Sequence, residues 1–351
     1  MRKLLIALIL LLGVLFVLTR FAELQDIVEV LQRGSLLFLG LALLVQAGWI
    51  YNLGAFYQAV YKIFDLEETR FHMIQLVTAA NFLTVIAPSA GLSAIAIFLT
   101  DARRRGRSPA KVTVAGVLYV WFEYIGTLTV LVFGLAELAH RNNLHWAEIT
   151  ASIILLAGAL GLSLLIYLGM KSASALGATL AWMARAVNWA ARPFLHRDYL
   201  RVERAYTFSS EIAEGITVLR GHPRWIYKPL LLALLNKALL LGVLFLSFQA
   251  FRVPVDPGTL VAGLSIAHLF LIVSPTPAGI GIVEGILAVA LNSLGIPLED
   301  ATVVTIAYRG FSFWLPFLAG LVTFRLLSRG RPAVEPVVEA VGTIEHQEIS
   351  L

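Results

Sequence analysis

The sequence predicts an all-α, polytopic membrane protein. Of its 351 residues, 59% are hydrophobic and only 14% are charged, whereas a soluble domain carries about 25% charged residues. The mean hydropathy is +0.83, and the apolar residues gather in runs long enough to cross roughly 30 Å of hydrocarbon. This composition excludes a disordered chain and a nucleic-acid-binding module. The absence of cysteine excludes a disulfide scaffold, a thiol nucleophile and a cysteine-based metal centre.

Eight apolar runs account for most of the chain. Six of them are predicted to be full spans: Leu4–Thr19, Leu36–Gln58, Val112–Leu135, Ile149–Gly169, Trp225–Phe251 and Ala301–Leu327. The other two, Met73–Thr100 and Thr259–Leu294, are interrupted by Pro and Gly at 87–91 and 274–281. Because Pro removes a backbone donor and Gly loosens the backbone, we expect no continuous helix through either run.

The first run has two interpretations, a cleaved signal peptide or an anchor that is retained. It follows a basic start at Arg2 and Lys3, and the chain continues beyond it as Leu18-Thr19-Arg20-Phe21. No small-residue cleavage pattern is present there, so we expect the run to remain as the first span.

Positive charge orients the spans, because cytoplasmic loops carry an excess of Lys and Arg. Besides the N-terminus, the basic stretches are 101–111, 171–224 and the exit after Arg325. They place both termini in the cytoplasm. Met73–Thr100 then enters and leaves on the cytoplasmic side, and Thr259–Leu294 does so from outside. Each is therefore predicted to be a re-entrant hairpin.

A displacement of 189 residues superposes landmarks of the two halves. It carries Pro88 onto Pro277, Gly106 onto Gly295 and Tyr119 onto Tyr308. The paired runs have opposite directions in the topology above, so we predict inverted repeats, about 1–136 and 149–327, within a single transmembrane domain 1–331. Inverted repeats with broken helices are typical of transporters, whose sites lie where the breaks meet.

The insert 171–224 is too polar to span the membrane and is predicted to lie on the cytoplasmic side. One helical face carries apolar residues, at Leu176, Leu180, Met183 and Val187, and its flank carries Trp182, Arg185, Trp189 and Arg192. A second stripe comprises Phe208, Ile212, Ile216 and Leu219. Both stripes fit either the lipid interface or packing against the bundle. The acidic tail 332–351 is predicted to be disordered.

Five ionisable residues lie deep within the apolar runs: Glu123, Lys237, His268, Glu284 and Arg309. A charge that faces lipid costs about 3 kcal/mol or more, so each is expected to face the interior and to have a partner. We expect Glu284, just after the second break, to pair with Arg309, and Glu123 to pair with Lys237. Either pair could serve a site or only packing. His268 fits a hydrogen-bonded core histidine better than a ligand or a proton relay.

The hairpin tips suggest an anion site. A new helix begins after each break, and its free N–H groups and positive dipole end favour anions. The residues concerned are glycines that allow close approach of the backbone and neighbouring hydroxyls: Gly91, Gly279, Gly281, Ser89, Ser274 and Thr276. The simpler alternative is that Pro and Gly only turn the chain.

The sequence contains no His-Glu-x-x-His, Walker or Gly-x-Ser-x-Gly motif and no Asp pair at metal spacing. We therefore expect neither an enzyme nor a metal or cofactor site.

The stretch Ser274-Pro275-Thr276-Pro277-Ala278-Gly279-Ile280-Gly281-Ile282-Val283-Glu284 is followed by Gly295-Ile296-Pro297, Ala301, Tyr308-Arg309, Leu315-Pro316 and Gly320. This pattern resembles the flippase-like transmembrane family of lysylphosphatidylglycerol synthases. The first half is similar through Asn81, Pro88, Gly91 and the basic loop Arg103–Arg107, but the family's usual Gly-Gly-Glu is here Ala90-Gly91-Leu92.

The resemblance implies a flippase-like bundle that handles lipids. Full synthases carry a soluble domain that transfers lysine from tRNA to phosphatidylglycerol. The 351 residues leave no room for that domain, so no lysyl transfer is expected.

From the buried charges, the breaks and this resemblance, we expect a protein of the inner, cytoplasmic membrane that binds an anionic phospholipid or lipid-linked headgroup and moves it between leaflets. Its expected partners are membrane lipids and not nucleic acid. Two alternatives stay open. One is a proton-coupled secondary transporter of a small polar solute that uses Glu284, Glu123 or His268. The other is a membrane subunit that assists a lipid-modifying enzyme. The oligomeric state is not predicted.

Overall fold

The structure is a computed structural model that describes residues 27–86, 92–195, 206, 209, 226–274 and 276–328. The predicted first span, the first break, the second stripe of the insert and the acidic tail lie outside these residues. Within the described ranges every regular element is helical, as the all-α class predicts.

Among the described residues, five segments are long and apolar enough to cross a membrane. They are α2 (Leu36–Ile63), α5 (Pro109–His140), α6 (Trp146–Lys171), α9 (Tyr227–Ala250) and the segment Leu298–Leu327. Each coincides with one of the predicted runs. The sixth predicted span, Leu4–Thr19, lies outside the described residues.

The last of these segments is not one uniform α-helix. It consists of α12 (Leu298–Arg309), the π-helical turn η3 (Gly310–Trp314) and α13 (Leu315–Ser328). A π turn inserts an extra residue per turn and is often found at functional sites. The π turn begins directly after Arg309. It was not predicted for the run Ala301–Leu327.

Each interrupted run forms short helices that pack against each other. The first run contains α3 (Arg70–Ile86) and α4 (Leu92–Arg104), and the second contains α10 (Pro257–Val273), the short turn η2 (Pro277–Gly279) and α11 (Ile282–Ser293). The interruption predicted for the second run is present, because Ala278 in η2 has a left-handed φ of 53°.

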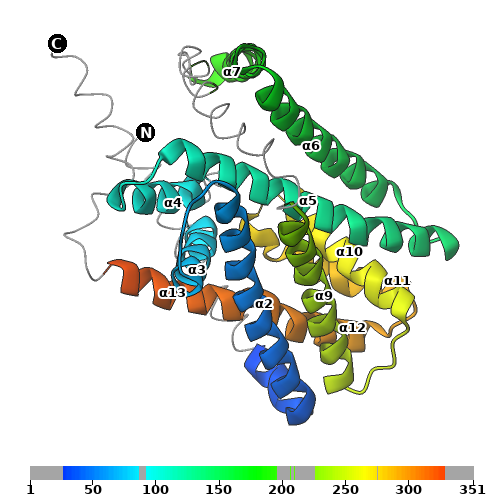
Figure 1. The fold of residues 1–351 in the computed structure, drawn as a ribbon. Helices are drawn as coiled ribbons and strands as arrows, with labels where there is room; N and C mark the ends of the chain where they lie inside the picture. Colours follow the sequence, from blue (N-terminus) through cyan, green and yellow to red (C-terminus); the bar gives the residue numbers. More distant parts are fainter. Residues whose placement is uncertain are drawn as a thin grey trace, which may run out of the picture.

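The two halves of the chain pack in an exchanged pattern. Helix α2 lies beside α9 (Figure 1), while α3 packs on α13 and α10 packs on α5. Adding 189 to the bounds of α4, 92 and 104, gives 281 and 293, and α11 spans Ile282–Ser293. The same displacement carries α3 close to α10, and it carries α5 onto the segment from α12 to α13. The contact between α3 and α13 therefore corresponds to the contact between α10 and α5. Each helix of one half packs against a helix of the other half, which is the pattern that a two-fold relation gives.

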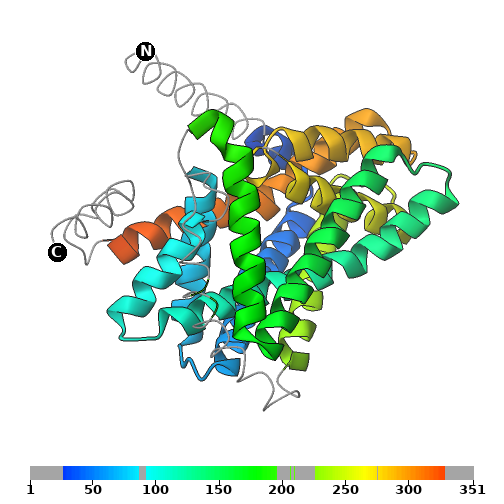
Figure 2. The ribbon, with the colours of Figure 1, turned by 90° about the horizontal axis from the view of Figure 1, so that it is seen from above.

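Helices α6 and α7 lie at the edge of the bundle. Helix α7 (Ala173–Leu195) is seen end-on in Figure 1 and lengthwise in Figure 2, so the chain changes direction sharply after α6. The apolar face predicted for α7 is buried at one end and exposed further along the helix. Leu176 is buried, but Met183 and Val187 are 43% and 45% exposed. The small side chains of Ala181 and Ala184 face the protein instead.

Small residues allow the exchanged helix pairs to approach closely. A Cβ atom on Gly320 of α13 would lie 2.3 Å from the backbone oxygen of Thr78 in α3. On the other side, a Cβ atom on Gly134 of α5 would lie 2.0 Å from Oγ of Ser265 in α10. Close helix packing of this kind is the main source of stability between helices in lipid.

We predict that Gly320→Val destabilises the fold by about 1–3 kcal/mol, because the added side chain meets backbone and not a flexible group. The matched control is Gly48→Val in α2, where a Cβ atom would meet nothing within 4 Å. The measurement is the melting temperature in detergent, followed by size-exclusion chromatography. Equal melting temperatures for the two variants would contradict the close packing.

Candidate functional site

A cavity of about 400 Å³ lies where helices of both halves meet. Its wall is formed by α2, α3, α5, α9, α10, η2, α11, α12, η3 and α13. The polar and ionisable residues that line it are Trp49, Asn81, Thr84, Glu123, Asn236, Lys237, His268, Tyr308, Arg309 and Ser312. Four of the five deep ionisable residues predicted from the sequence therefore share one cavity, and the fifth, Glu284, binds to its wall through Arg309.

The predicted ion pair between Glu284 and Arg309 is present. Nε of Arg309 donates to Oε1 of Glu284 at 2.6 Å, and the Arg309 side chain is only 6% exposed. Nη2 of Arg309 also donates to the carbonyl oxygen of Ala278 at 3.2 Å, and the guanidinium lies 4.8 Å from the ring centre of Phe313. One side chain thus connects the last span to the second break and to the first turn of α11, which follows it.

The second break itself presents Ala278 to the cavity. Pro277 begins the turn η2, and Gly279 and Gly281 follow with positive φ values of 68° and 76°. A non-glycine residue at positive φ is unfavourable, and the hydrogen bond from Arg309 to Ala278 helps to hold it. Here the two glycines are required by the turn.

The hydroxyls predicted to face a ligand are engaged inside the turn. Oγ of Ser274 and Oγ1 of Thr276 are 2.8 Å apart, and Thr276 also donates to the carbonyl oxygen of Ile280 at 3.0 Å. Neither residue lines the cavity. At the first tip, Pro88, Ser89 and Gly91 lie outside the described residues.

The second predicted pair is also present, because Nζ of Lys237 donates to Oε1 of Glu123. The side chain of Lys237 is 4% exposed and that of Glu123 is 29% exposed. This contact joins α9 to α5. Beside it, Nε1 of Trp49 donates to Oδ1 of Asn236 at 3.0 Å and joins α2 to α9.

Both carboxylates use only one oxygen in their ion pairs. In the described part of the chain, Oε2 of Glu123 and Oε2 of Glu284 are buried and lack a hydrogen-bond partner. An unpaired buried acceptor costs about 1–3 kcal/mol. Each of these two oxygen atoms is therefore able to accept a hydrogen bond from a group that enters the cavity beside it. The two ion pairs together carry no net charge.

His268 lines the same cavity and is hydrogen bonded, as expected for a core histidine. Its Nδ1 lies 3.0 Å from the carbonyl oxygen of Leu264. A carbonyl only accepts, so Nδ1 carries the hydrogen in the neutral ring and Nε2 is the acceptor.

Asn81 and Tyr308, predicted from the family resemblance, both line the cavity. Trp49, Thr84, Asn236 and Ser312 line it as well and were not predicted. A polar residue inside an apolar run was the available signal for Asn236, which directly precedes Lys237. Trp49 resembles any other apolar residue of its run.

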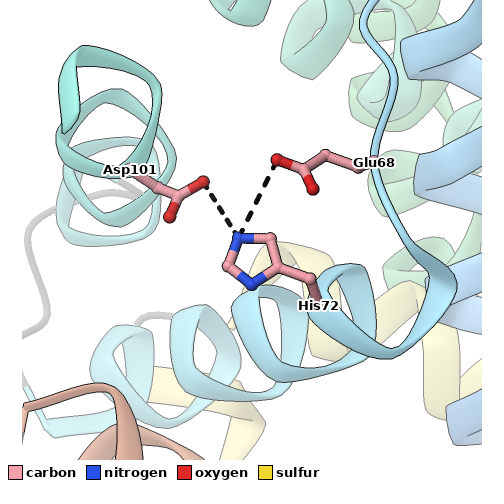
Figure 3. A group of neighbouring side chains, drawn as sticks. All are labelled: Glu68, His72 and Asp101. Atoms are coloured by element: carbon pink, nitrogen blue, oxygen red, sulfur yellow. Dashed lines mark hydrogen bonds and ion pairs between the residues drawn. The ribbon is translucent and has the colours of Figure 1, made fainter. Parts of the chain in front are cut away.

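A second group of charged side chains lies at the N-terminal end of α3 and the C-terminal end of α4. Figure 3 shows the carboxylates of Glu68 and Asp101 directed at the ring of His72. Nε2 of His72 lies 3.0 Å from Oδ2 of Asp101 and 4.0 Å from Oε1 of Glu68. By distance alone the three side chains could surround a metal ion.

Two arginines of the basic loop already neutralise both carboxylates. Arg105 lies 3.5 Å from Oε2 of Glu68 and 3.4 Å from Oδ1 of Asp101, and Arg107 lies 3.0 Å from Oε1 of Glu68. A divalent cation would have to displace a guanidinium. We therefore interpret the group as an ion network that attaches the basic loop to the connection between α2 and α3. It gives Arg105 and Arg107 a structural role besides the topological one predicted for them.

A family model described as "Lysylphosphatidylglycerol synthase TM region" matches residues 4–320. No curated protein and no solved structure matches the chain.

We predict that Arg309→Met alone lowers the free energy of unfolding by about 3–5 kcal/mol, because it leaves the Glu284 carboxylate buried without its cation. The double variant Arg309→Met/Glu284→Leu should lose less than the single variant, since no unpaired charge is left. Thermal unfolding in detergent measures both. A double variant that is less stable than Arg309→Met would show that the pair is not the stabilising unit.

The ion network predicts a pH dependence. Burial raises the pKa of Asp101, but the hydrogen bond and charge of His72 and the charge of Arg105 outweigh it and lower the pKa below 3.8. The ionised carboxylate therefore stabilises the protein at neutral pH, and this contribution is lost as the pH falls through the lowered pKa.

Asp101→Asn should accordingly cost about 1–2 kcal/mol at pH 7, and the difference from the parent protein should shrink below pH 4. The control is Asp65→Asn, an exposed residue of the connection between α2 and α3. Melting temperatures measured across this range test the prediction, and a difference that is constant with pH would refute the ionic contribution.

Proposed function

Because the chain belongs to the lysylphosphatidylglycerol synthase transmembrane family, we propose that it binds the phosphate-bearing headgroup of an anionic phospholipid, or a lipid-linked headgroup, in the central cavity and moves it between leaflets. In this proposal the two interrupted runs are re-entrant hairpins, the halves are inverted repeats, and both termini lie on the cytoplasmic side of the cytoplasmic membrane.

The observation that carries the proposal is the shared cavity. Ionisable residues within spans are rare and usually mark a functional site or a transport path, and four of them line one space beside a broken helix. Interrupted helices that meet at such a space are typical of transporter sites. The exchanged packing of α3–α13 and α10–α5 supports the proposed inverted repeats.

The geometry suggests how a headgroup would be held. Arg309 and Lys237 are already positioned by Glu284 and Glu123, so little reorganisation is needed to bind a phosphate with their remaining N–H groups. The first turn of α11 lies at the wall through Val283 and adds the positive end of its dipole. The unpartnered carboxylate oxygens would accept from donors of the headgroup. The process breaks no covalent bond.

A second candidate, a proton-coupled transporter of a small polar solute, is favoured by one specific observation. His268 has an acceptor nitrogen at the cavity, and the Oε2 atoms of Glu123 and Glu284 are unpartnered within the described residues. These three groups could take up a proton. Under this candidate, an imposed pH gradient drives uptake of a solute whatever lipid is present.

We predict that Arg309→Ala, in liposomes with a fluorescent phosphatidylglycerol analogue, slows lipid scrambling at least about tenfold, the effect of one lost charge-assisted hydrogen bond. Arg309→Lys keeps the charge and should retain part of the rate. Arg103→Ala, an exposed change in the basic stretch, is the control.

All variants are compared at equal reconstituted amounts of monodisperse protein. Unchanged scrambling by Arg309→Ala would overturn the role of this residue. If solute uptake responds to a pH gradient while scrambling is absent from the parent protein, the second candidate is favoured.

A further inference from the structure

A second pocket, of about 540 Å³, lies between α2 and α3 and shares no lining residue with the central cavity. Its lining residues are Tyr51, Gln58, Lys62, Arg70, Phe71 and Ile74. Tyr51 and Phe71 are 52% and 71% exposed, so the pocket is open to the surface. It combines two cations with two exposed aromatic rings.

The pocket continues an apolar stripe along the outside of α2. Leu37, Leu41 and Leu44 are all exposed. Tyr51, Gln58 and Lys62 follow them on the same helical face, because successive members of the series are three, four or seven residues apart. Because α2 is a candidate span, this face contacts lipid tails. The stripe ends at Lys62, in the last turn of α2, where cations meet the membrane–water interface.

Arg70 is held in place by neutral groups. Its guanidinium carbon lies 5.0 Å from the centre of the Tyr51 ring, and Nη1 donates to the Tyr51 hydroxyl. Nε of Arg70 lies 3.3 Å from Oε1 of Gln58, whose amide in turn donates to the carbonyl oxygen of Glu68 at 2.6 Å. Nη2 takes no part in these contacts. The cation is therefore oriented without being neutralised.

No carboxylate of the described residues forms an ion pair with Lys62 or Arg70. The connection between them contains three acidic residues. Glu68 pairs with Arg105 and Arg107 instead, and Asp65 and Glu67 are exposed and form no ion pair in the described part of the chain. Two positive charges thus lie uncompensated at the end of a lipid-facing stripe.

We propose that this groove is a surface site for one anionic phospholipid. The phosphodiester binds Lys62 and Arg70, the rings of Tyr51 and Phe71 lie at the level of the headgroup, and an acyl chain follows the leucine stripe of α2. Basic pockets between helices at the membrane surface suit such headgroups, and the orientation of Arg70 lowers the cost of binding. The site does not depend on transport through the central cavity.

The test is native mass spectrometry of the full chain released from nanodiscs that contain equal amounts of phosphatidylcholine and phosphatidylglycerol. We expect the parent protein to retain phosphatidylglycerol in preference, and Lys62→Ala/Arg70→Ala to retain at least about tenfold less, as for the loss of a charge-assisted contact. The matched control with the same change of charge is Arg103→Ala/Arg104→Ala, two exposed arginines at the end of α4. It should retain the lipid.

Equal loss in the control variant, or equal retention of phosphatidylcholine by the parent protein, would overturn the proposal. Inorganic phosphate at millimolar concentration is a further arm, and displacement of the lipid by phosphate alone would show an anion site without lipid specificity. If the double variant does not fold, Lys62→Gln and Tyr51→Phe should each show a smaller loss. Adding Lys62→Ala/Arg70→Ala to Arg309→Ala should remove further phosphatidylglycerol, which separates the surface site from the proposed transport site.

Discussion

The requirement that every charge in the hydrocarbon region has a partner organises this protein. Arg309 meets that requirement through three contacts, with the carboxylate of Glu284, the carbonyl oxygen of Ala278 and the ring of Phe313. The first two contacts join the second break and the helix α11 that follows it to the last span. The left-handed backbone at Ala278 and the π turn after Arg309 are both local costs. They persist because they bring the guanidinium, the carboxylate and the helix break together.

Much of the fold could be predicted from the sequence because each element carries a strong local signal. Uninterrupted apolar runs marked the helices α2, α5, α6 and α9, and Pro and Gly marked the break between α10 and α11. The Glu284–Arg309 and Glu123–Lys237 pairs followed from the cost of a charge in lipid, since few ionisable residues were available as partners.

The remaining features depend on tertiary packing that no local pattern carries. Ser274 and Thr276 bond inside their own turn, which only the backbone path determines. In α7 the small side chains of Ala181 and Ala184 are buried and the larger Met183 and Val187 are exposed, and the apolar stripe alone does not indicate which of them contact the protein. The network of Glu68, His72 and Asp101 joins residues from a loop and two helices, and nothing in their sequence spacing indicated that they meet.

The neutrality of the central cavity has a consequence for the membrane potential. A charge that crosses the field gains or loses about 2.3 kcal/mol per 100 mV. The two ion pairs of the wall contribute equal numbers of positive and negative charges, so their movement together across the field would transfer no net charge. The electrical work of a transport cycle would then come from the cargo alone. The voltage dependence of the transport rate would be set by the net charge of the molecule that is carried.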